Sequence, residues 1–225
     1  MMVMEQPGYE PIETMDLTAG EACLDFVNTG SRLLERHAGL EGETLAAAGP
    51  FGDRLTSYRD LVTFAKRAKL VDGATGRALQ VRAAAEPVAA AEVLEEARTL
   101  RESLFRTFAA VGRGAPVAEA DLVLLQKRAA AAAGRQQLVR GDTGYELAWP
   151  ATPELDRMLW PLATAAVALL LSGEVARVKE CAAEECAWLF LDSSKNRSRR
   201  WCDMKACGNR AKARHYYHRH QSSQG

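Results

Sequence analysis

Four of the chain's five cysteines form two short pairs, Cys181/Cys186 and Cys202/Cys207. Each pair encloses four residues, and 15 residues separate the two pairs. Cysteine pairs joined by such a spacer can place four thiolates around one tetrahedral Zn²⁺. Because four thiolates leave no open coordination position, the spacing predicts one structural zinc ion and not a catalytic one.

Other uses of these residues stay open at the level of sequence. The four cysteines could form disulfides or a redox-labile cluster instead. Three histidines, His215, His218 and His220, could compete as zinc ligands, although with four cysteines available they are more simply phosphate contacts or exposed side chains. The fifth cysteine, Cys23, lies in a short apolar run and is interpreted as a small buried hydrophobe.

The segment around the second cysteine pair is strongly basic. Residues 193–220 hold nine Lys and Arg residues against one acid, Asp203. From Arg177 onward the chain carries 11 basic and 5 acidic residues, a net charge of +6, and the preceding part carries −6. This asymmetry indicates a polyanionic partner, most simply nucleic acid, although a solvated basic surface with no partner would show the same charge.

The residues predicted to contact nucleic acid lie between the two cysteine pairs, within the second pair and after it. Residues 211–220 contain no proline or glycine, which favours a helix whose basic side chains follow a phosphate backbone. Asn209 could either cap that helix or contact a base edge. Trp188, Phe190 and Trp201 are expected to pack around the zinc site and not to stack on bases. The candidate contacts are Arg197, Arg199, Arg200, Lys205, Asn209, Arg210, Lys212 and Arg214.

Periodicity predicts a mainly α fold with one small β-hairpin. Apolar residues recur at helical spacing in several segments, and a Gly-Asp-Thr-Gly turn joins two short strands at residues 137–140 and 145–149. A hydroxyl, a proline and an acid at Thr152-Pro153-Glu154 predict the start of the last long helix. The expected helices cover residues 21–28, 60–70, 76–85, 88–111, 119–133 and from 152 towards 172, with a further turn at 174–179.

Three parts of the chain follow from this pattern. Residues 1–18 form an irregular leader, residues 19–173 form a helical domain, and residues 177–220 form a small zinc module. The module's order of cysteine knuckle, hairpin and helix is that of a treble-clef-like zinc finger. Gly39 to Gly52 is expected to be a loop. The module is too small to bury much core, so metal binding should supply much of its folding free energy.

Several function classes find no support in the sequence. Residues 1–10 carry no basic stretch followed by an apolar one, and the longest apolar stretch, Leu155 to Leu171, is interrupted by charges and a proline. We therefore expect a cytoplasmic protein with no membrane partner. No glycine-rich phosphate loop or nucleophile motif is present, so we do not expect an enzyme.

The motifs around the cysteines resemble the CGNR zinc finger family. The motif that names the family stands intact at Cys207-Gly208-Asn209-Arg210. Upstream, the segment Cys23 to Thr29 is similar to the start of the ABATE domain, which usually precedes this finger in bacterial proteins. The other segments that carry the resemblance are Cys181 to Cys186, Trp188 to Asp192, Arg199 to Met204 and Ala97 to Glu102.

The resemblance implies a bacterial transcription regulator, of a kind sometimes described as stress-induced. It implies that the finger binds DNA and that a helical domain with a few strands precedes it, and it assigns no ligand to that domain. We expect the helical body to sense a small-molecule effector or to form a homodimer. A zinc-stapled RNA-binding or protein-interaction adaptor is the alternative, because structural zinc modules serve those roles as well.

Overall fold

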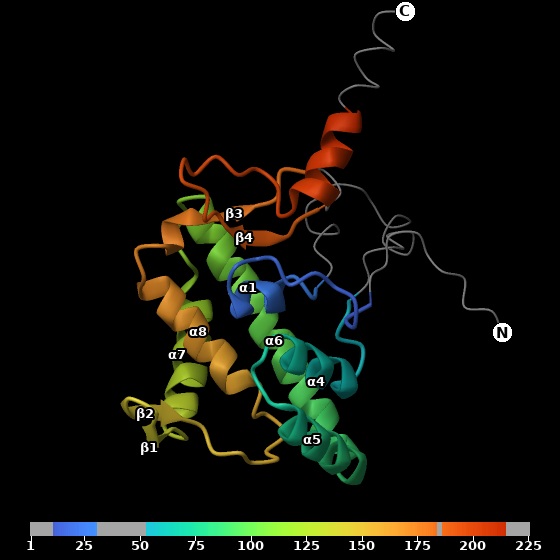
Figure 1. Ribbon diagram of the computed structural model, residues 1–225, viewed down its shortest axis with the longest axis vertical. Helices are drawn as coiled ribbons and strands as arrows, with labels where there is room; N and C mark the ends of the chain where they lie inside the picture. Colours follow the sequence, from blue (N-terminus) through green and yellow to red (C-terminus); the bar gives the residue numbers. More distant parts are fainter. Residues whose placement is uncertain (1–10, 31–52, 184–185, 215–225) are drawn as a thin grey trace, which may run out of the picture.

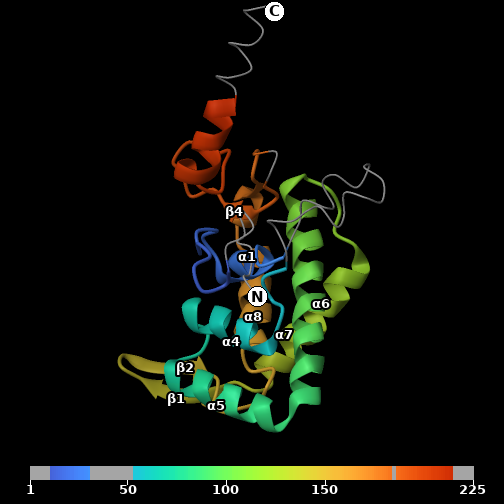
Figure 2. The same ribbon diagram turned by 90° about the vertical axis from the view of Figure 1, so that its right-hand side faces the viewer.

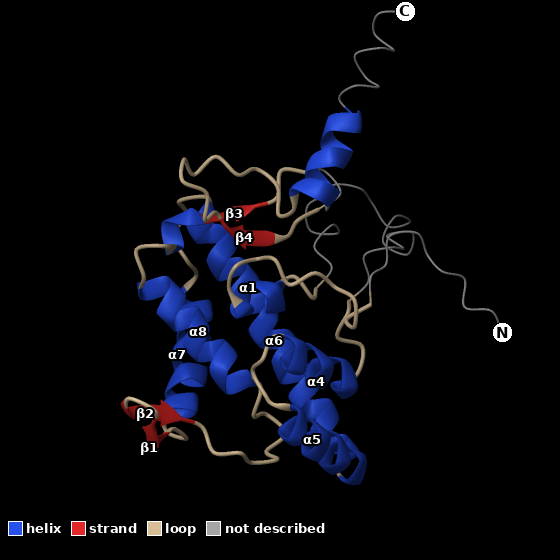
Figure 3. Ribbon diagram, in the orientation of Figure 1, coloured by secondary structure: helices blue, strands red, loops and turns tan. Residues whose placement is uncertain are grey.

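The computed structural model describes residues 11–30, 53–183 and 186–214, and it confirms a mainly α fold with two small antiparallel sheets (Figure 1, Figure 3). Helices make up most of the body, and the zinc module lies at one end of the molecule. In chain order the elements are α1 (Ala22–Val27), α4 (Tyr58–Arg67), α5 (Gly73–Ala85), α6 (Pro87–Gly112), α7 (Glu119–Ala133), β1 (Gln137–Gly141), β2 (Gly144–Ala148), α8 (Leu159–Leu171), η2 (Val175–Arg177), β3 (Val178–Glu180), β4 (Leu189–Leu191) and η3 (Met204–Gly208).

Local sequence explains where three of the described helices begin. The Ser57 side chain accepts a hydrogen bond from the Asp60 amide, and the Asp60 side chain accepts one from the Ser57 amide. These two reciprocal bonds form a capping box at the start of α4. Asp72 caps α5 in the same way through the amide of Thr75. In α6, proline at the first position is compatible with a helix start because its missing N–H would be unpaired there anyway.

The predicted start of the last long helix at Thr152 is wrong. The helix α8 begins at Leu159, seven residues later, after a turn at residues 155–158. Pro161 gives the physical reason. A helix running from residue 153 would carry Pro161 in its interior, where the ring clashes with the carbonyl four residues earlier. Starting at Leu159 places Pro161 in the first turn, where it is tolerated.

The long helix α6 connects the two ends of the molecule. Its 26 residues span about 39 Å at 1.5 Å per residue, and it runs from α5 at one end to β3 at the other (Figure 2). At its C-terminal end Gly112 lies against β3, since a Cβ at this position would stand 3.0 Å from the Val178 carbonyl oxygen. The last residue of the helix must therefore be small for the zinc module to lie where it does.

The two sheets are separate hairpins at opposite ends of the body (Figure 1). The predicted hairpin is confirmed, with Leu138 paired to Leu147 and a two-residue turn between Gly141 and Gly144. The second sheet pairs β3 with β4 and belongs to the zinc module. The expected turn at 174–179 divides between η2 and the first residues of β3.

The outer edge of β4 is closed by residues of the N-terminal segment. The Asn28 side chain donates to the Leu189 carbonyl at 2.9 Å and accepts from the Leu189 amide at 2.9 Å. The Leu191 amide donates to the Ala19 carbonyl at 2.7 Å. Asn28 is 1% exposed, so its amide substitutes for one residue of a third strand in a buried position. These hydrogen bonds attach the zinc module directly to the body of the protein.

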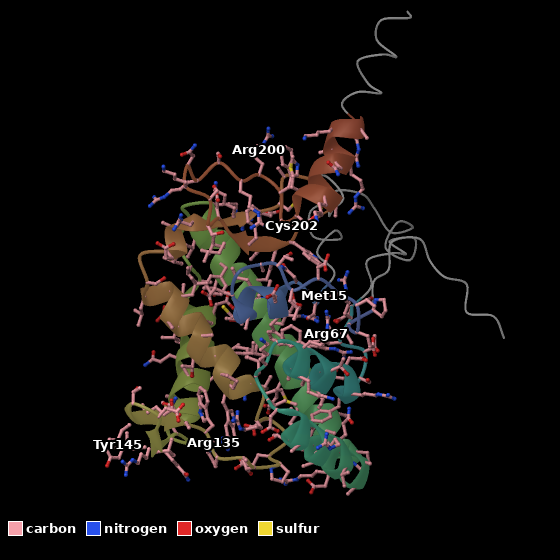
Figure 4. All side chains as sticks on the ribbon, in the orientation of Figure 1. Met15, Arg67, Arg135, Tyr145, Arg200 and Cys202 are labelled. Carbon is pink, nitrogen blue, oxygen red and sulfur yellow. The ribbon has the colours of Figure 1, made fainter. Side chains whose placement is uncertain are left out.

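One hydrophobic core serves the body and the module together. Cys23 is fully buried in it, which agrees with its interpretation as a hydrophobe, and burial raises the pKa of its thiol to about 12. Residues 11–18 are irregular in backbone, yet Ile12 and Met15 are buried in the same core (Figure 4). Phe190 of β4 belongs to it as well. The expected loop at residues 39–52 lies outside the described residues. Within the described residues, no helix is long and apolar enough to cross a bilayer.

A buried carboxylate in α1 should make stability depend on pH. Burial raises the pKa of Asp25 to about 6, despite the hydrogen bond from the Ala19 amide and the charge of Arg67. A raised pKa favours the native state below the unfolded value, and this contribution is lost as the pH rises through about 6. Between pH 5 and 7.5 we expect Asp25 to lower the unfolding free energy by about 1 kcal/mol.

Asp25→Asn should remove this slope while keeping an acceptor for the Ala19 amide. Denaturant unfolding of both proteins at pH 5 and 7.5 measures the difference, and Asp142→Asn in the exposed hairpin turn is the matched control. Parallel pH profiles for wild type and Asp25→Asn would contradict the prediction.

Candidate metal centre and basic surface

The four paired cysteines come together at one point in the structure. Their sulfur atoms all lie within 4.8 Å of one another. The Cys202 sulfur is 3.7 Å from that of Cys186 and 3.6 Å from that of Cys207. Four sulfurs at about 2.3 Å from one zinc ion would be about 3.8 Å apart. The cluster therefore has the size of a four-thiolate site, and it fits one structural Zn²⁺.

The secondary structure of the module brings the ligands together. Cys181 directly follows β3, Cys186 precedes β4, and Cys207 lies within the wide turn η3. The Cys202 amide points at the Cys181 sulfur, with a separation of 3.4 Å, and the Ala182 amide donates to the Arg200 carbonyl at 2.8 Å. These backbone contacts hold the two cysteine loops against each other.

The chemistry of the donor set also suits a cation. Hydrogen bonds with Cys186, and then with Cys202 and Cys207, hold the pKa of the Cys181 thiol far below its ordinary value. Four adjacent sulfurs cannot all ionise without a positive charge among them. Arg210 supplies part of such a charge from outside, since its Nη2 lies 4.0 Å from the Cys207 sulfur. A bound zinc ion would supply the rest and would fix the loops as a structural staple.

A buried carboxylate organises the loop between the cysteine pairs. Asp192 is fully buried and accepts from the Lys179 ammonium at 2.6 Å, the Ser194 hydroxyl at 2.5 Å and the Arg199 amide at 3.0 Å. Burial alone would raise the pKa of Asp192, but these hydrogen bonds outweigh it and hold the pKa well below the ordinary value. Asp192 thus fixes the path of the basic loop that follows.

Arg199 is committed to the module's own backbone. Its Nε donates to the Trp201 carbonyl at 2.9 Å, and its Nη2 donates to the Cys202 carbonyl. The guanidinium also lies over the Phe190 ring, 4.6 Å from the centroid. A side chain held on three sides in this way supports the cysteine loop, and it is half-buried where the neighbouring arginines are exposed.

Most of the other sequence-predicted contact residues are exposed on the module. Arg200 stacks on Trp201, 5.4 Å from the ring centroid, near the zinc ligand Cys202 (Figure 4). Arg214 is half-buried. The exposed residues are Arg197, Arg200, Lys205, Asn209, Arg210 and Lys212. Arg200 and the cysteine cluster lie at the end of the molecule opposite the hairpin that bears Tyr145 (Figure 4), and Arg210 approaches the cluster with its Nη2 4.0 Å from the Cys207 sulfur.

Of the two roles left open for Asn209, helix cap or base contact, the structure excludes the cap. Asp203 is the residue with extended backbone at the start of this turn, and its side chain accepts from the Ala206 amide at 2.6 Å. Asn209 has helical dihedral angles and continues into helical residues 209–214. The helix predicted for 211–220 therefore begins earlier, and its second half, with the three histidines, lies outside the described residues. The Asn209 side chain is exposed and available to a partner.

The aromatic residues of the module pack, as predicted. Phe190 is fully buried. Trp188 is half-buried against the core, and the Arg54 guanidinium lies over its ring at 5.6 Å from the centroid. Sequence reasoning missed the supporting roles of Asn28, Lys179 and Asp192. Asn28 and Asp192 lie inside motifs that resemble the family pattern, but the residue type of Asn28 does not reveal a partner 161 positions away, nor that of Asp192 a partner 13 positions away.

Two family models match the chain, and together they cover most of it. A model described as "Putative stress-induced transcription regulator" (ABATE) matches residues 20–173. A model described as CGNR zinc finger matches residues 177–220. Neither description is that of an enzyme family. No curated protein matches the sequence.

Proposed function

Because the chain belongs to the ABATE family and carries a CGNR zinc finger, we propose that it is a DNA-binding transcription regulator whose finger contacts DNA. The helical body would act as its sensor or dimerisation domain. One observation supports the proposal most directly: the segment that carries the zinc-type cysteine cluster also carries several exposed cationic side chains, in an otherwise acidic protein.

The proposed DNA contacts are narrower than the set predicted from sequence. Arg199 is left out because its guanidinium binds the backbone of the finger itself. Arg214 is left out because it is half-buried. Arg210 has a double role, since it faces the Cys207 sulfur and is also exposed. Arg197, Arg200, Lys205 and Lys212 would contact phosphates, and Asn209 would reach a base edge.

Charge reversal tests this surface without disturbing the metal cluster. We expect the triple variant Arg200→Glu, Lys205→Glu and Lys212→Glu to weaken DNA binding at least about a hundredfold, because three phosphate contacts are replaced by repulsion. Each lost contact should also reduce the slope of log affinity against log salt concentration by roughly 0.9. Fluorescence anisotropy with genomic fragments selected by the wild-type protein measures both quantities. Zinc content should stay unchanged.

The matched control is Arg140→Glu, which reverses an exposed arginine on β1 at the far end of the body. It changes the net charge but not the proposed surface, so binding should change less than about twofold. Equal losses in the control and the triple variant would indicate only nonspecific attraction. Tighter binding of RNA than of DNA in direct competition would favour the adaptor function.

A further inference from the structure

The helical body contains an open cavity far from the finger. It lies where α4 ends and α5 begins, and the segment that follows the hairpin closes its other side. Its volume is about 460 Å³, which is within the range of small-molecule sites. The wall combines cationic and apolar side chains, among them Lys66, Lys69, Arg157, Val71, Trp149 and Ala151.

Arg157 is the unusual member of this wall. It is 8% exposed, and its guanidinium lies between two indole rings, 5.6 Å from the centroid of Trp149 and 5.1 Å from that of Trp160. Its Nε donates to the Pro150 carbonyl at 3.2 Å, but its Nη1 has no hydrogen-bond partner. Burying a charged donor without an acceptor costs free energy, and native proteins seldom leave one so.

The described wall of the cavity carries more cationic than acidic side chains. Neither Lys66 nor Lys69 forms an ion pair with any residue that the structure describes. Among the described residues of the wall, Asp72 is the one acid; its side chain accepts from the Thr75 amide at 2.7 Å as the cap of α5, and its charge also acts on Arg157. Three cations therefore face the cavity against one committed carboxylate.

The cavity also offers an apolar surface with a fixed orientation. The Trp149 Nε1 donates to the Ala132 carbonyl at 2.8 Å, so this indole is held in place by α7. Leu70 and Val71 line the wall beside the lysines. An inorganic anion would use the cations and leave this surface in contact with water, whereas a molecule with an acid group and an apolar body would use both.

We propose that this cavity binds a small organic acid, whose carboxylate lies against Arg157, Lys66 and Lys69 and whose apolar body lies against Trp149, Leu70 and Val71. The carboxylate would pair with the charge of the Arg157 guanidinium, and a charge-assisted hydrogen bond to arginine is among the stronger polar contacts in proteins. This site would give the body its sensor role. Binding is measured without DNA, so this proposal and the proposed DNA-binding function can fail separately.

The test uses the full-length zinc-loaded protein and a series of monocarboxylates: acetate, butyrate, benzoate and indole-3-acetate. Benzyl alcohol is the neutral counterpart of benzoate, and inorganic phosphate is the anion without an apolar body. We expect benzoate or indole-3-acetate at 10 mM to raise the unfolding midpoint by roughly 2 °C or more. Calorimetric titration should give one site per chain, and the fluorescence of Trp149 should change on binding.

Three variants locate the site. Arg157→Met should weaken binding at least about tenfold. Because Arg157 also packs between two indoles, Lys69→Gly provides a variant that should fold normally. Lys69 has a φ of 57°, a left-handed conformation that glycine adopts without strain. The Lys69→Gly and Lys66→Gln variants should each weaken binding about threefold or more. The control variant Lys127→Gln, on α7, should bind as wild type.

Each of three outcomes would overturn the proposal. Benzyl alcohol could bind as tightly as benzoate, which would show an apolar groove that does not select for an acid. Phosphate could bind and the carboxylates not, which would show a site for inorganic anions. The third outcome is that none of the carboxylates binds at 10 mM, or that binding persists in both Arg157→Met and Lys69→Gly. Either result would show that this cavity is not an acid-binding site.

Discussion

Replacing Cys202 with serine should remove the zinc ion and unfold the finger. Structural zinc sites of this kind contribute about 10–16 kcal/mol of apparent binding free energy, which matches or exceeds the whole stability of a typical domain, about 5–15 kcal/mol. The Cys202 sulfur lies 3.7 Å and 3.6 Å from the sulfurs of two other ligands. We expect less than one zinc ion per chain and loss of DNA binding.

The body should be destabilised along with the finger. Val178, Leu189 and Phe190 are buried in the core that contains α1 and α6. An unfolded finger would withdraw these side chains and expose the surface that they cover, so the thermal transition of the helices should also move to lower temperature. If the finger folded independently of the body, the thermal transition of the helices would keep its wild-type midpoint in this variant.

The matched control is Cys23→Ala. This cysteine is as fully buried as Cys181 but lies in α1 and has an unreactive thiol, with a pKa of about 12. The variant should keep one zinc ion per chain and lose only about 1 kcal/mol from the small cavity it creates. Elemental analysis and thermal unfolding of the two variants measure the difference. A Cys202→Ser protein with one tightly bound zinc and an unchanged midpoint would contradict the assignment.

Much of the fold could be predicted from the sequence because its signals are local. Helical spacing of apolar residues gave the range of α6 to within one residue at each end, and the Gly-Asp-Thr-Gly turn located the first hairpin. The predicted start of α8 was wrong because two prolines, Pro153 and Pro161, each favour a different first turn for the helix. Pro153 has the better cap before it, but Pro161 restricts the helix more strongly, since it would otherwise occupy the interior.

The metal cluster could also be predicted, since cysteine spacing fixes which thiols can share one ion. The basic surface could be predicted only in part. Charge and spacing treat Arg199 and Arg200 alike, yet one guanidinium binds the carbonyls of Trp201 and Cys202 while its neighbour is exposed. The difference comes from the path of the loop, which Asp192 fixes through contacts that no sequence period reveals.

The contact between body and finger depends on Asn28, and removing its side chain should cost about 2–6 kcal/mol. Asn28→Ala would leave both the amide and the carbonyl of Leu189 without a partner in a buried position, at about 1–3 kcal/mol for each group. Asn28→Asp is a sharper test, because it keeps the acceptor for the amide but sets a carboxylate against the Leu189 carbonyl. We expect a loss of stability in both variants, measured by denaturant unfolding.

Hydrogen exchange would separate this contact from a general loss of stability. The Leu189 and Leu191 amides donate to Asn28 and Ala19, and not to β3, so they should exchange faster in Asn28→Ala. The Cys181 amide, which donates to Trp188 within the finger, should stay protected because zinc still holds that loop. Asn196→Ala, in the exposed loop after β4, should change neither quantity. If Leu189 exchanges as in wild type, the finger is held to the body by its apolar contacts alone, and Asn28 has no part in positioning it.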